Sequence, residues 1–399
     1  MVTIGIMVYV SMSSCYNNLT KAQEDFYQEA NFADYYFLVV KAPHQVVKEV
    51  ENIKGVKRAT GRITLDLAIL KEDNKRATAR IVTYSLPMDN ELNRLLLEEG
   101  RIFTERGTGS GIEIMTNPGF KDANQIRWGD SIAVVYEGKP IYLTVVGTAN
   151  SPEFVYPVKD ITDIIPDHKN FGIFMIPQYE AGQVFNFEGQ INQLLVEFTS
   201  DADSDQVVEE IKELLKPYGL LTSYPRDDQL SHAMLQAEFD SIRSLITTLP
   251  VIFLLIAAGI QFVILRRMVR HQRGQVGVLK ALGYSNRHII LHYSSYALLV
   301  GFLGALLGSL AGWMLSGLLT DYFLLYFNMP SSGSGFNLQA IINGFLLSMG
   351  VGGVAGWSAA RQVTKIQPAE SMRREAPKMG RKSIVEEWPY LWRKLGTDW

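Results

Sequence analysis

The chain has 399 residues, 20% of them charged, a formal net charge of −3 and a mean hydropathy of +0.04. This length fits two or three structural units, and a single cysteine, Cys15, excludes an intrachain disulfide. The averages hide an uneven distribution, because three long uncharged stretches lie in the second half of the chain.

The N-terminal segment Met1–Cys15 is apolar, but it is shorter than the ~20 residues that a membrane-spanning helix needs. We interpret residues 1–17 as the outer end of a first transmembrane helix whose start precedes Met1. The alternative is a signal peptide or lipoprotein anchor that ends at Ser13-Ser14-Cys15. That alternative is disfavoured because no basic residue precedes the apolar run and the lipobox is poor.

Residues 18–243 have the composition of a soluble α+β domain. Near each end of this segment, the pattern predicts a strand, an amphipathic helix and a second strand. The first β-α-β unit comprises Tyr35–Val40, His44–Ile53 and Arg58–Leu70, and the second comprises Leu194–Phe198, Asp203–Leu215 and a short strand after Gly219. Between them lie the predicted strands Thr78–Tyr84, Ser131–Tyr136, Tyr142–Gly147 and Gly172–Ile176. We expect the two units to pair and to bracket an inserted β-rich subdomain.

Three later stretches, at about 245–265, 291–319 and 338–360, contain no Asp, Glu, Lys or Arg. At 1.5 Å per residue, a helix of about 21 residues covers the ~30 Å hydrocarbon core of a bilayer. Buried helices of a soluble protein are the alternative, but core helices of this length usually keep one charged face. We therefore predict an α-helical membrane protein whose membrane region is 244–362.

Basic residues next to these stretches predict the orientation. The connector 266–288 holds six Lys or Arg and no acid, and residues 361–382 are also net basic. Basic loops of membrane proteins normally face the cytoplasm. We therefore expect a multi-pass protein of the plasma or inner membrane, with residues 18–243 as a large extracytoplasmic α+β domain.

Small residues recur every four positions in the last two apolar stretches, which places them on one face of each helix. One series is Gly304, Gly308, Gly312 and Ser316, and the other is Gly344, Ser348, Gly352, Gly356 and Ala360. Such faces allow close helix packing, either with each other or with a partner. Apart from His292 at one edge, neither stretch holds an ionisable group that could mark a proton or ion path, which disfavours a charge-relay transporter.

The sequence offers no catalytic or cofactor motif. Asp160, Asp163, Asp167 and His168 could be imagined as metal ligands, but a solvated loop explains them better, so we expect no metal. The glycine-containing loop 107–111 lacks the Lys-Ser/Thr of a phosphate-binding loop, so ATP would be handled by another chain. The basic connector lacks interleaved aromatic residues, which disfavours nucleic acid as a partner.

The connector carries a specific motif. Residues 267–283 read RMVRHQRGQVGVLKALG, a basic run followed by a core close to R-x-x-E-I/V-G-x-L-K/R-A-L-G. This segment resembles the connector of FtsX-like/MacB-like ABC transporter permeases. Residues 357–373 look like the end of the last span and the tail of that domain, and residues 145–156 are similar to part of the external domain in two-repeat members. The resemblance covers most of the chain.

The resemblance implies that the connector is a short cationic helix that docks into a groove on a separate ATPase subunit. The docking loop would comprise Arg273, Gln275, Val276, Gly277, Leu279, Lys280, Ala281, Leu282 and Gly283. The residues that would face the ATPase are Gln275, Val276, Leu279, Leu282 and Gly283. Charge complementarity would come from Arg273 and Lys280. Gln275 stands where many relatives have Glu, which puts a salt bridge in doubt and leaves room for a hydrogen bond. Alternatively, the basic connector fixes the topology and touches anionic lipid.

The tail 363–399 ends in a predicted amphipathic helix in the headgroup plane. Its apolar face comprises Trp388, Leu391, Trp392, Leu395 and Trp399, and the opposite face carries Arg393 and Lys394. In two-repeat members such a helix resembles the approach to a further span. We therefore expect this chain to be about one half of a longer permease, with a natural short form as the alternative.

Family relatives move lipids, lipoproteins, peptides or macrolides, or transmit force to external cell-wall hydrolases. The resemblance thus implies a non-enzymatic permease subunit that couples ATP hydrolysis by another subunit to movements of its external domain. Its partners would be the ATPase, a second permease half or protomer, and membrane lipid. The alternatives are a non-transporting regulator that activates an external hydrolase or senses a ligand, and a membrane-tethered enzyme.

Overall fold

The structure is a computed structural model, and it describes residues 1–71, 77–88, 91–104, 111–163, 165–330, 333 and 335–364. The predicted amphipathic helix at 388–399 lies outside the described residues. The chain divides into two compact units. The first contains Met7–Pro250 and Gly308–Ile342, and the second contains Met1–Ile6, Val251–Leu307 and the described residues from Asn343 onward.

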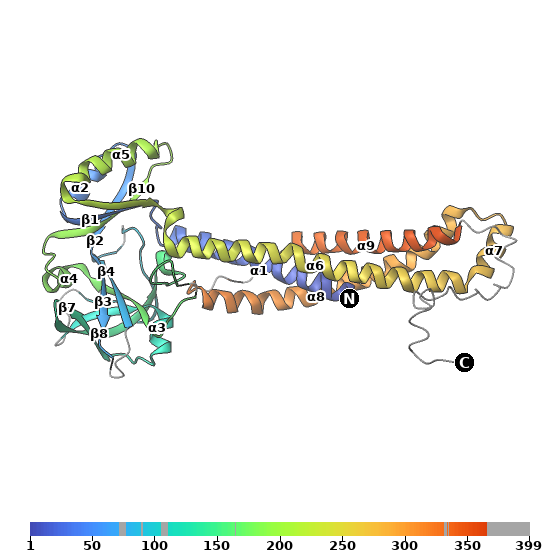
Figure 1. The fold of residues 1–399 in the computed structure, drawn as a ribbon, viewed down its shortest axis with the longest axis horizontal. Coiled ribbons are helices and arrows are strands. Elements are labelled where there is room, and N and C mark those ends of the chain that lie inside the picture. Colours follow the sequence, from blue (N-terminus) through green and yellow to red (C-terminus); the bar gives the residue numbers. More distant parts are fainter. Residues whose placement is uncertain are drawn as a thin grey trace, which may run out of the picture. The chain divides into compact units, whose positions relative to one another are not determined.

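The predicted pairing of the two β-α-β units is confirmed by a four-stranded antiparallel sheet with the order β11-β1-β10-β2. Its strands are β1 (Tyr35–Pro43), β2 (Val56–Arg62), β10 (Gln190–Phe198) and β11 (Leu220–Pro225). Helices α2 (Val46–Glu51) and α5 (Ser204–Leu215) pack their valines and leucines on one face of this sheet. Figure 1 labels β1, β2 and β10 of this sheet, with α2 and α5 beside them. Asp203 caps α5, because its side chain accepts a hydrogen bond from the Gln206 N–H.

The inserted β-rich subdomain is a seven-stranded sheet with the order β5-β8-β6-β9-β4-β3-β7. An additional pairing between β7 and β8 closes six of these strands into a barrel, and β5 continues along the second half of β8. The strands are β3 (Thr64–Ile69), β4 (Ala77–Tyr84), β5 (Leu96–Gly100), β6 (Ile112–Thr116), β7 (Ser131–Tyr136), β8 (Lys139–Asn150) and β9 (Phe171–Pro177). Isoleucine, valine and phenylalanine side chains fill this core.

The predicted long strand 58–70 is wrong, because the chain passes from one sheet to the other at Ile63. The Ile63 N–H donates to the Thr83 hydroxyl at 2.8 Å. The backbone of Thr64 exchanges two hydrogen bonds with the Asn192 side chain. These side-chain partners replace the strand neighbours at the crossing, so β2 ends at Arg62 and β3 begins at Thr64.

Short elements complete the α+β domain. Helix α3 (Pro118–Ala123) and helix α4 (Gln178–Val184) lie beside the barrel strands, and η1 (Pro152–Phe154) follows β8. The 3₁₀ turns η2 (Lys216–Tyr218) and η3 (Arg226–Asp228) flank β11.

Three helices of the described chain have the length and composition to cross a membrane, and they contain the three predicted apolar stretches. They are α6 (Leu230–His271), α8 (Asn286–Tyr326) and α9 (Leu338–Thr364). At 1.5 Å per residue, α6 is about 63 Å long, twice the bilayer core, so much of it must lie outside the hydrocarbon. Helix α1 (Val2–Glu29) likewise runs well past Cys15, and the short helix α7 (Arg273–Ala281) lies between α6 and α8.

Candidate functional site

The connector between α6 and α8 is folded around one buried side chain. Val276 of α7 is only 1% exposed and packs with Val269 of α6, with Ile289 and Tyr293 of α8, and with Ala360 of α9. The Tyr293 hydroxyl also donates a hydrogen bond to the Gln272 side-chain oxygen at 2.9 Å. The connector is therefore fixed to all three long helices.

Helix α7 ends in a left-handed turn at Gly283, whose φ is +89°. The N–H groups of Gly283 and Tyr284 donate to the carbonyls of Lys280 and Leu279, which closes the C-terminus of α7. The left-handed conformation costs glycine little energy and costs most other residues more, which explains a glycine at position 283. The turn leaves Leu282 71% exposed.

The predicted docking residues divide into an exposed group and a buried group. The exposed residues are Gln275, Ala281, Leu282 and Gly283. The half-buried residues are Arg273, Leu279 and Lys280. Val276 and Gly277 are buried, which differs from the expectation that Val276 faces a partner, because Val276 fills the space between the long helices. Two exposed apolar residues beside Leu282, Val278 and Tyr284, were missing from the predicted set.

The small-residue series on α9 faces α8. The Ser348 hydroxyl donates to the Gly301 carbonyl at 2.7 Å. A Cβ at Gly352 would lie 2.9 Å from the Ala297 carbonyl oxygen, and one at Gly356 would lie 2.9 Å from the Ser294 Cα. At these positions a side chain has no space, and Gly344 is buried as well.

The series on α8 instead faces α1. A Cβ at Gly304 would lie 2.8 Å from Val2, and one at Gly312 would lie 2.8 Å from the Met7 carbonyl oxygen. Gly308 and Ser316 on the same face are buried. The two series thus meet two different helices and do not interdigitate with each other.

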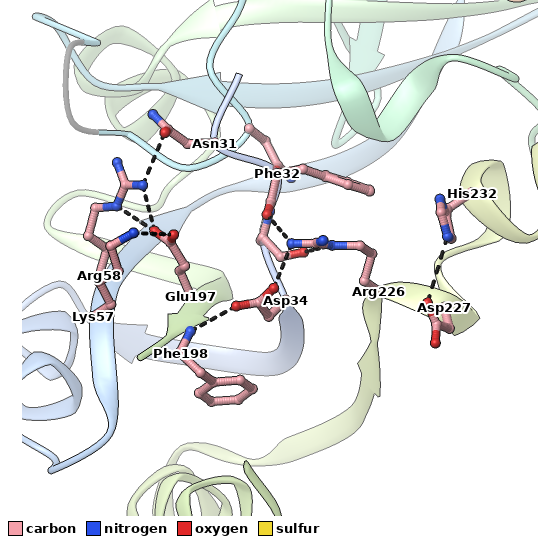
Figure 2. Close-up of polar contacts among 12 residues, drawn as sticks. Asn31, Phe32, Asp34, Lys57, Arg58, Glu197, Phe198, Arg226, Asp227 and His232 are labelled. Carbon is pink, nitrogen blue, oxygen red and sulfur yellow. Dashed lines mark hydrogen bonds and ion pairs between the residues drawn. The ribbon is translucent and has the colours of Figure 1, made fainter. Parts of the chain in front are cut away.

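In the α+β domain, Arg226 joins the two chain segments that connect the domain to α1 and α6 (Figure 2). Its guanidinium donates to the carbonyls of Phe32 and Ala33 and to the Asp34 carboxylate, and it lies 5.0 Å from the Phe32 ring centre. The second Asp34 oxygen accepts the Phe198 N–H of β10. One arginine therefore fixes the α1–β1 turn against the β11–α6 connection.

Polar contacts continue from this junction along α1 and α6. The Tyr27 hydroxyl lies 2.9 Å from His232 Nδ1, and the Gln236 amide donates to the Gln23 side-chain oxygen at 3.3 Å. Further along α1, the Asn18 amide donates to the Thr320 hydroxyl of α8 at 3.2 Å. These bonds give the helices of this unit a defined register.

A second, deeper polar group lies where the two sheets meet the start of α6. Arg62 of β2 donates to both Glu153 oxygens at 2.6 Å, and its Nε donates to the Gln193 side chain. Asn93 also donates to Glu153. The Gln229 amide, immediately before α6, donates to the Glu153 carbonyl at 2.8 Å. The Arg62–Glu153 pair thus connects the four-stranded sheet, the barrel and α6.

The acidic loop that could have been a metal site is explained by turn hydrogen bonds. Asp160 accepts from the backbone and hydroxyl of Thr162, and Asp167 accepts from the backbone of Lys169 and Asn170. The part of the chain that the structure describes contains no cluster of three or more His, Cys, Asp or Glu arranged to hold a metal ion.

Residues 247–368, which include most of α6 and all of α7, α8 and α9, match the family described as FtsX-like permease C-terminal. This segment is an FtsX-like permease domain. The connector that carried the resemblance in the sequence lies within this segment, between α6 and α8.

Curated relatives of the chain bear permease names. An uncharacterized ABC transporter permease of Mycoplasma genitalium is 24% identical over 212 residues, which are 50% of this chain and 16% of that protein. An uncharacterized ABC transporter permease of Bacillus subtilis is 29% identical over 107 residues, or 27% of this chain and 24% of that protein. The macrolide export ATP-binding/permease protein MacB of Salmonella paratyphi A is 23% identical over 235 residues, which are 58% of this chain and 35% of that protein. The chain thus spans about a sixth to a third of the length of these relatives.

Two solved external domains align with the chain. The extracellular domain of the noncanonic ABC-type transporter YknZ from Gram-positive bacteria aligns at 11% identity with a TM-score of 0.32, covering 48% of this chain and 98% of that one. The periplasmic region of MacB from Actinobacillus actinomycetemcomitans aligns at 13% identity with a TM-score of 0.33. The alignment covers 56% of this chain and 96% of that one.

Sequence reasoning found the connector of the FtsX-like permease domain but missed both polar groups of the α+β domain. Arg226 lies among the residues before α6 without a motif, and Arg62 and Glu153 are 91 residues apart. The available signals were a lone arginine at the end of a predicted β-rich domain and a glutamate after Ser151-Pro152. Neither signal is specific.

Proposed function

We propose that the chain is the permease subunit of an ABC transporter and that a separate ATPase subunit docks on the connector of its FtsX-like permease domain. ATP-driven movement of the ATPase would push the connector, and α6 would carry that push into the α+β domain. The cargo class implied by the resemblance is a lipid, lipoprotein or peptide that is exported or released.

The observation that carries the proposal is the division of the connector into an anchored and an exposed part. Val276 attaches α7 to α6, α8 and α9 through buried contacts, so a force on α7 reaches all three helices. Val278, Leu282 and Tyr284 are exposed apolar groups on the same short segment. Exposed apolar groups surrounded by basic residues are typical of a surface that binds a protein with acidic and apolar groups.

The orientation belongs to the same proposal. The basic residues of the connector support a cytoplasmic location, where ATP is available, and therefore an external α+β domain. The external domain would then respond as a unit, because Arg226 and the Arg62–Glu153 pair hold the start of α6 against both sheets. A second permease half or a second copy would complete the transporter.

A single exposed residue tests the docking surface. We expect Leu282→Asp to abolish co-purification with an ATP-binding subunit that is encoded beside the chain and co-expressed with it. Stimulation of ATP hydrolysis by the permease should fall in parallel, while the yield of the permease in the membrane stays the same. The physical reason is that a carboxylate would have to be desolvated in an apolar contact.

The matched control is Leu221→Asp, at a similarly exposed leucine (66%) on β11 of the α+β domain. This change should leave ATPase binding intact. Unaltered ATPase binding by Leu282→Asp, or equal losses in both variants, would contradict docking at the connector.

A further inference from the structure

The α+β domain contains a cleft of about 490 Å³ whose walls come from both sheets. One wall is formed by the turn after β1 and by the start of β10, which belong to the four-stranded sheet. The other is formed by the end of β4 and by α4 of the barrel. The lining residues are His44, Ser85, Gln178, Tyr179, Gly182, Gln183, Phe187, Glu188, Gly189 and Gln190. A volume of this size is in the range of clefts that hold small organic ligands.

The lining of the cleft is mostly polar and uncharged. Glutamine supplies three of its side chains, and the described lining residues include one carboxylate, Glu188, and no Lys or Arg. The side chains of Gln183 and Gln190 make no hydrogen bond to other residues that the structure describes. Each amide therefore offers both donors and an acceptor. Such a site disfavours anions and suits a ligand that carries many uncharged donors and acceptors.

Helix α4 gives the cleft an aromatic wall. Tyr179 and Gln183 are four residues apart and therefore share one face of α4. The Tyr179 side chain is 53% exposed, although it is large and apolar over most of its area. An exposed aromatic ring beside amides can cover the apolar C–H face of a sugar ring while the amides bind its hydroxyls.

The cleft is held in shape by two backbone hydrogen bonds and one side-chain hydrogen bond. The His44 N–H donates to the Gly189 carbonyl at 2.8 Å, which joins the β1 turn to the loop before β10. The Phe187 N–H donates to the Gly182 carbonyl at 2.8 Å, which closes the end of α4. The Ser85 hydroxyl donates to the Gln178 side-chain oxygen at 3.2 Å across the barrel side. A fixed geometry lowers the entropic cost of binding a small ligand.

From these features we infer that the cleft between α4 and the β1 turn binds a neutral oligosaccharide, with Tyr179 as the stacking ring and Gln183 and Gln190 as hydrogen-bonding groups. This inference does not depend on ATPase docking, since it concerns a different part of the chain.

The test uses the full chain in lipid nanodiscs, because alkyl-glycoside detergents would compete for the site. The probes are N,N′-diacetylchitobiose and maltotriose, and binding is measured by saturation-transfer NMR and calorimetry. We expect at least one probe to bind the wild-type chain. Tyr179→Ala and Gln183→Ala should each weaken that binding about tenfold, the factor expected for the loss of one good contact. Tyr179→Phe keeps the ring and should retain most of the affinity.

Matched controls are Tyr142→Ala on β8, whose side chain is 61% exposed, and Gln206→Ala on α5, both outside the cleft. Neither should change binding. The inference is overturned if neither sugar binds, or if Tyr142→Ala weakens binding as much as Tyr179→Ala does. It is also overturned if the uncharged peptide N-acetyl-triglycine amide displaces the sugar at equal concentration, because the cleft would then be a peptide site.

Discussion

Arg62 and Glu153 form a two-point ion pair in which both side chains are almost fully buried. The two N···O distances are 2.6 Å, and the side-chain exposures are 3% and 2%. Two further hydrogen bonds surround the pair: Asn93 donates to Glu153, and the Gln193 side-chain oxygen accepts from Arg62 Nε. Burying two charges is costly unless geometry and additional hydrogen bonds compensate, and here both conditions are met.

The first prediction is that breaking this pair destabilises the α+β domain strongly. Glu153→Gln should cost about 3–5 kcal/mol, because it leaves the buried Arg62 charge without its counter-ion. Hydrogen exchange of the β2 and β10 amides measures the free energy of opening. The control is Asp66→Asn, which breaks the more exposed Arg80–Asp66 pair and should cost about 0–1 kcal/mol. Equal costs for the two variants would contradict the assigned role of the pair.

A second prediction concerns the geometry of Arg226. Arg226→Lys keeps the positive charge but cannot reach the Phe32 and Ala33 carbonyls and the Asp34 carboxylate at once. We expect a loss of about 1–3 kcal/mol in local stability, the range for hydrogen bonds to charged groups. Faster hydrogen exchange of the amides at the start of β1 and of α6 would show this loss of local stability. Lys41→Arg, at a surface lysine on β1, should have no such effect, and unchanged exchange in Arg226→Lys would refute the prediction.

Local patterns in the sequence predicted much of the fold but little of its polar interior. The helix 203–215 follows from spacing within one segment, and so do the three apolar helices. Strands β5 and β6 are five residues long and were missed, because runs so short carry little periodicity. The break at Ile63 depends on Thr83 and Asn192, which no local pattern connects to it.

The difference between local patterns and contacts of distant segments also decides which parts of the candidate sites the sequence predicted. The motif of the connector is contiguous, so sequence alone located it. Which of its side chains point inward depends on α8 and α9, and the burial of Val276 was therefore not predictable. Conversely, the four-residue spacing on α8 and α9 identified the close-packed faces, but their separate partners, α1 for one and α8 for the other, emerged only from the structure.

A third prediction follows from the environment of Glu91. Burial raises the pKa of its carboxyl from 4.5 to about 7, although the Ser85 N–H and Arg62 oppose the shift. Between pH 4.5 and 7 the folded chain therefore binds more protons at this position than the unfolded chain. The contribution of Glu91 to stability is present below pH 4.5 and is lost as the pH rises through 7.

Glu91→Gln should remove this dependence, because the amide oxygen can still accept the Ser85 N–H while the group no longer titrates. Thermal unfolding of the purified chain from pH 4.5 to 8 tests it. Relative to wild type, the variant should gain stability from pH 4.5 to about 7 and should gain no more above pH 7. A constant difference between the two chains at every pH would show that Glu91 does not titrate as described.

The fourth prediction concerns orientation in the membrane. In a Cys15→Ala background, Glu209→Cys on the exposed face of α5 should react with a membrane-impermeant maleimide on intact cells. Leu282→Cys in the connector should react only after lysis, because basic connectors are retained in the cytoplasm. Mass spectrometry of the labelled chain quantifies both. Labelling of Leu282→Cys on intact cells would reverse the proposed topology.

The last prediction uses two glycines of α9 that are only two residues apart. At Gly352 an added Cβ would lie 2.9 Å from the Ala297 carbonyl oxygen, whereas at Gly350 it would meet nothing within 4 Å. Gly352→Val should therefore force α9 away from α8 and cost about 1–3 kcal/mol, as overpacking of a close contact does. Gly350→Val adds the same side chain to the same helix and should change stability by only a few tenths of a kcal/mol. Thermal unfolding in lipid nanodiscs compares the two. Equal losses would mean that valine disturbs α9 itself, and that the contact with α8 does not limit its packing.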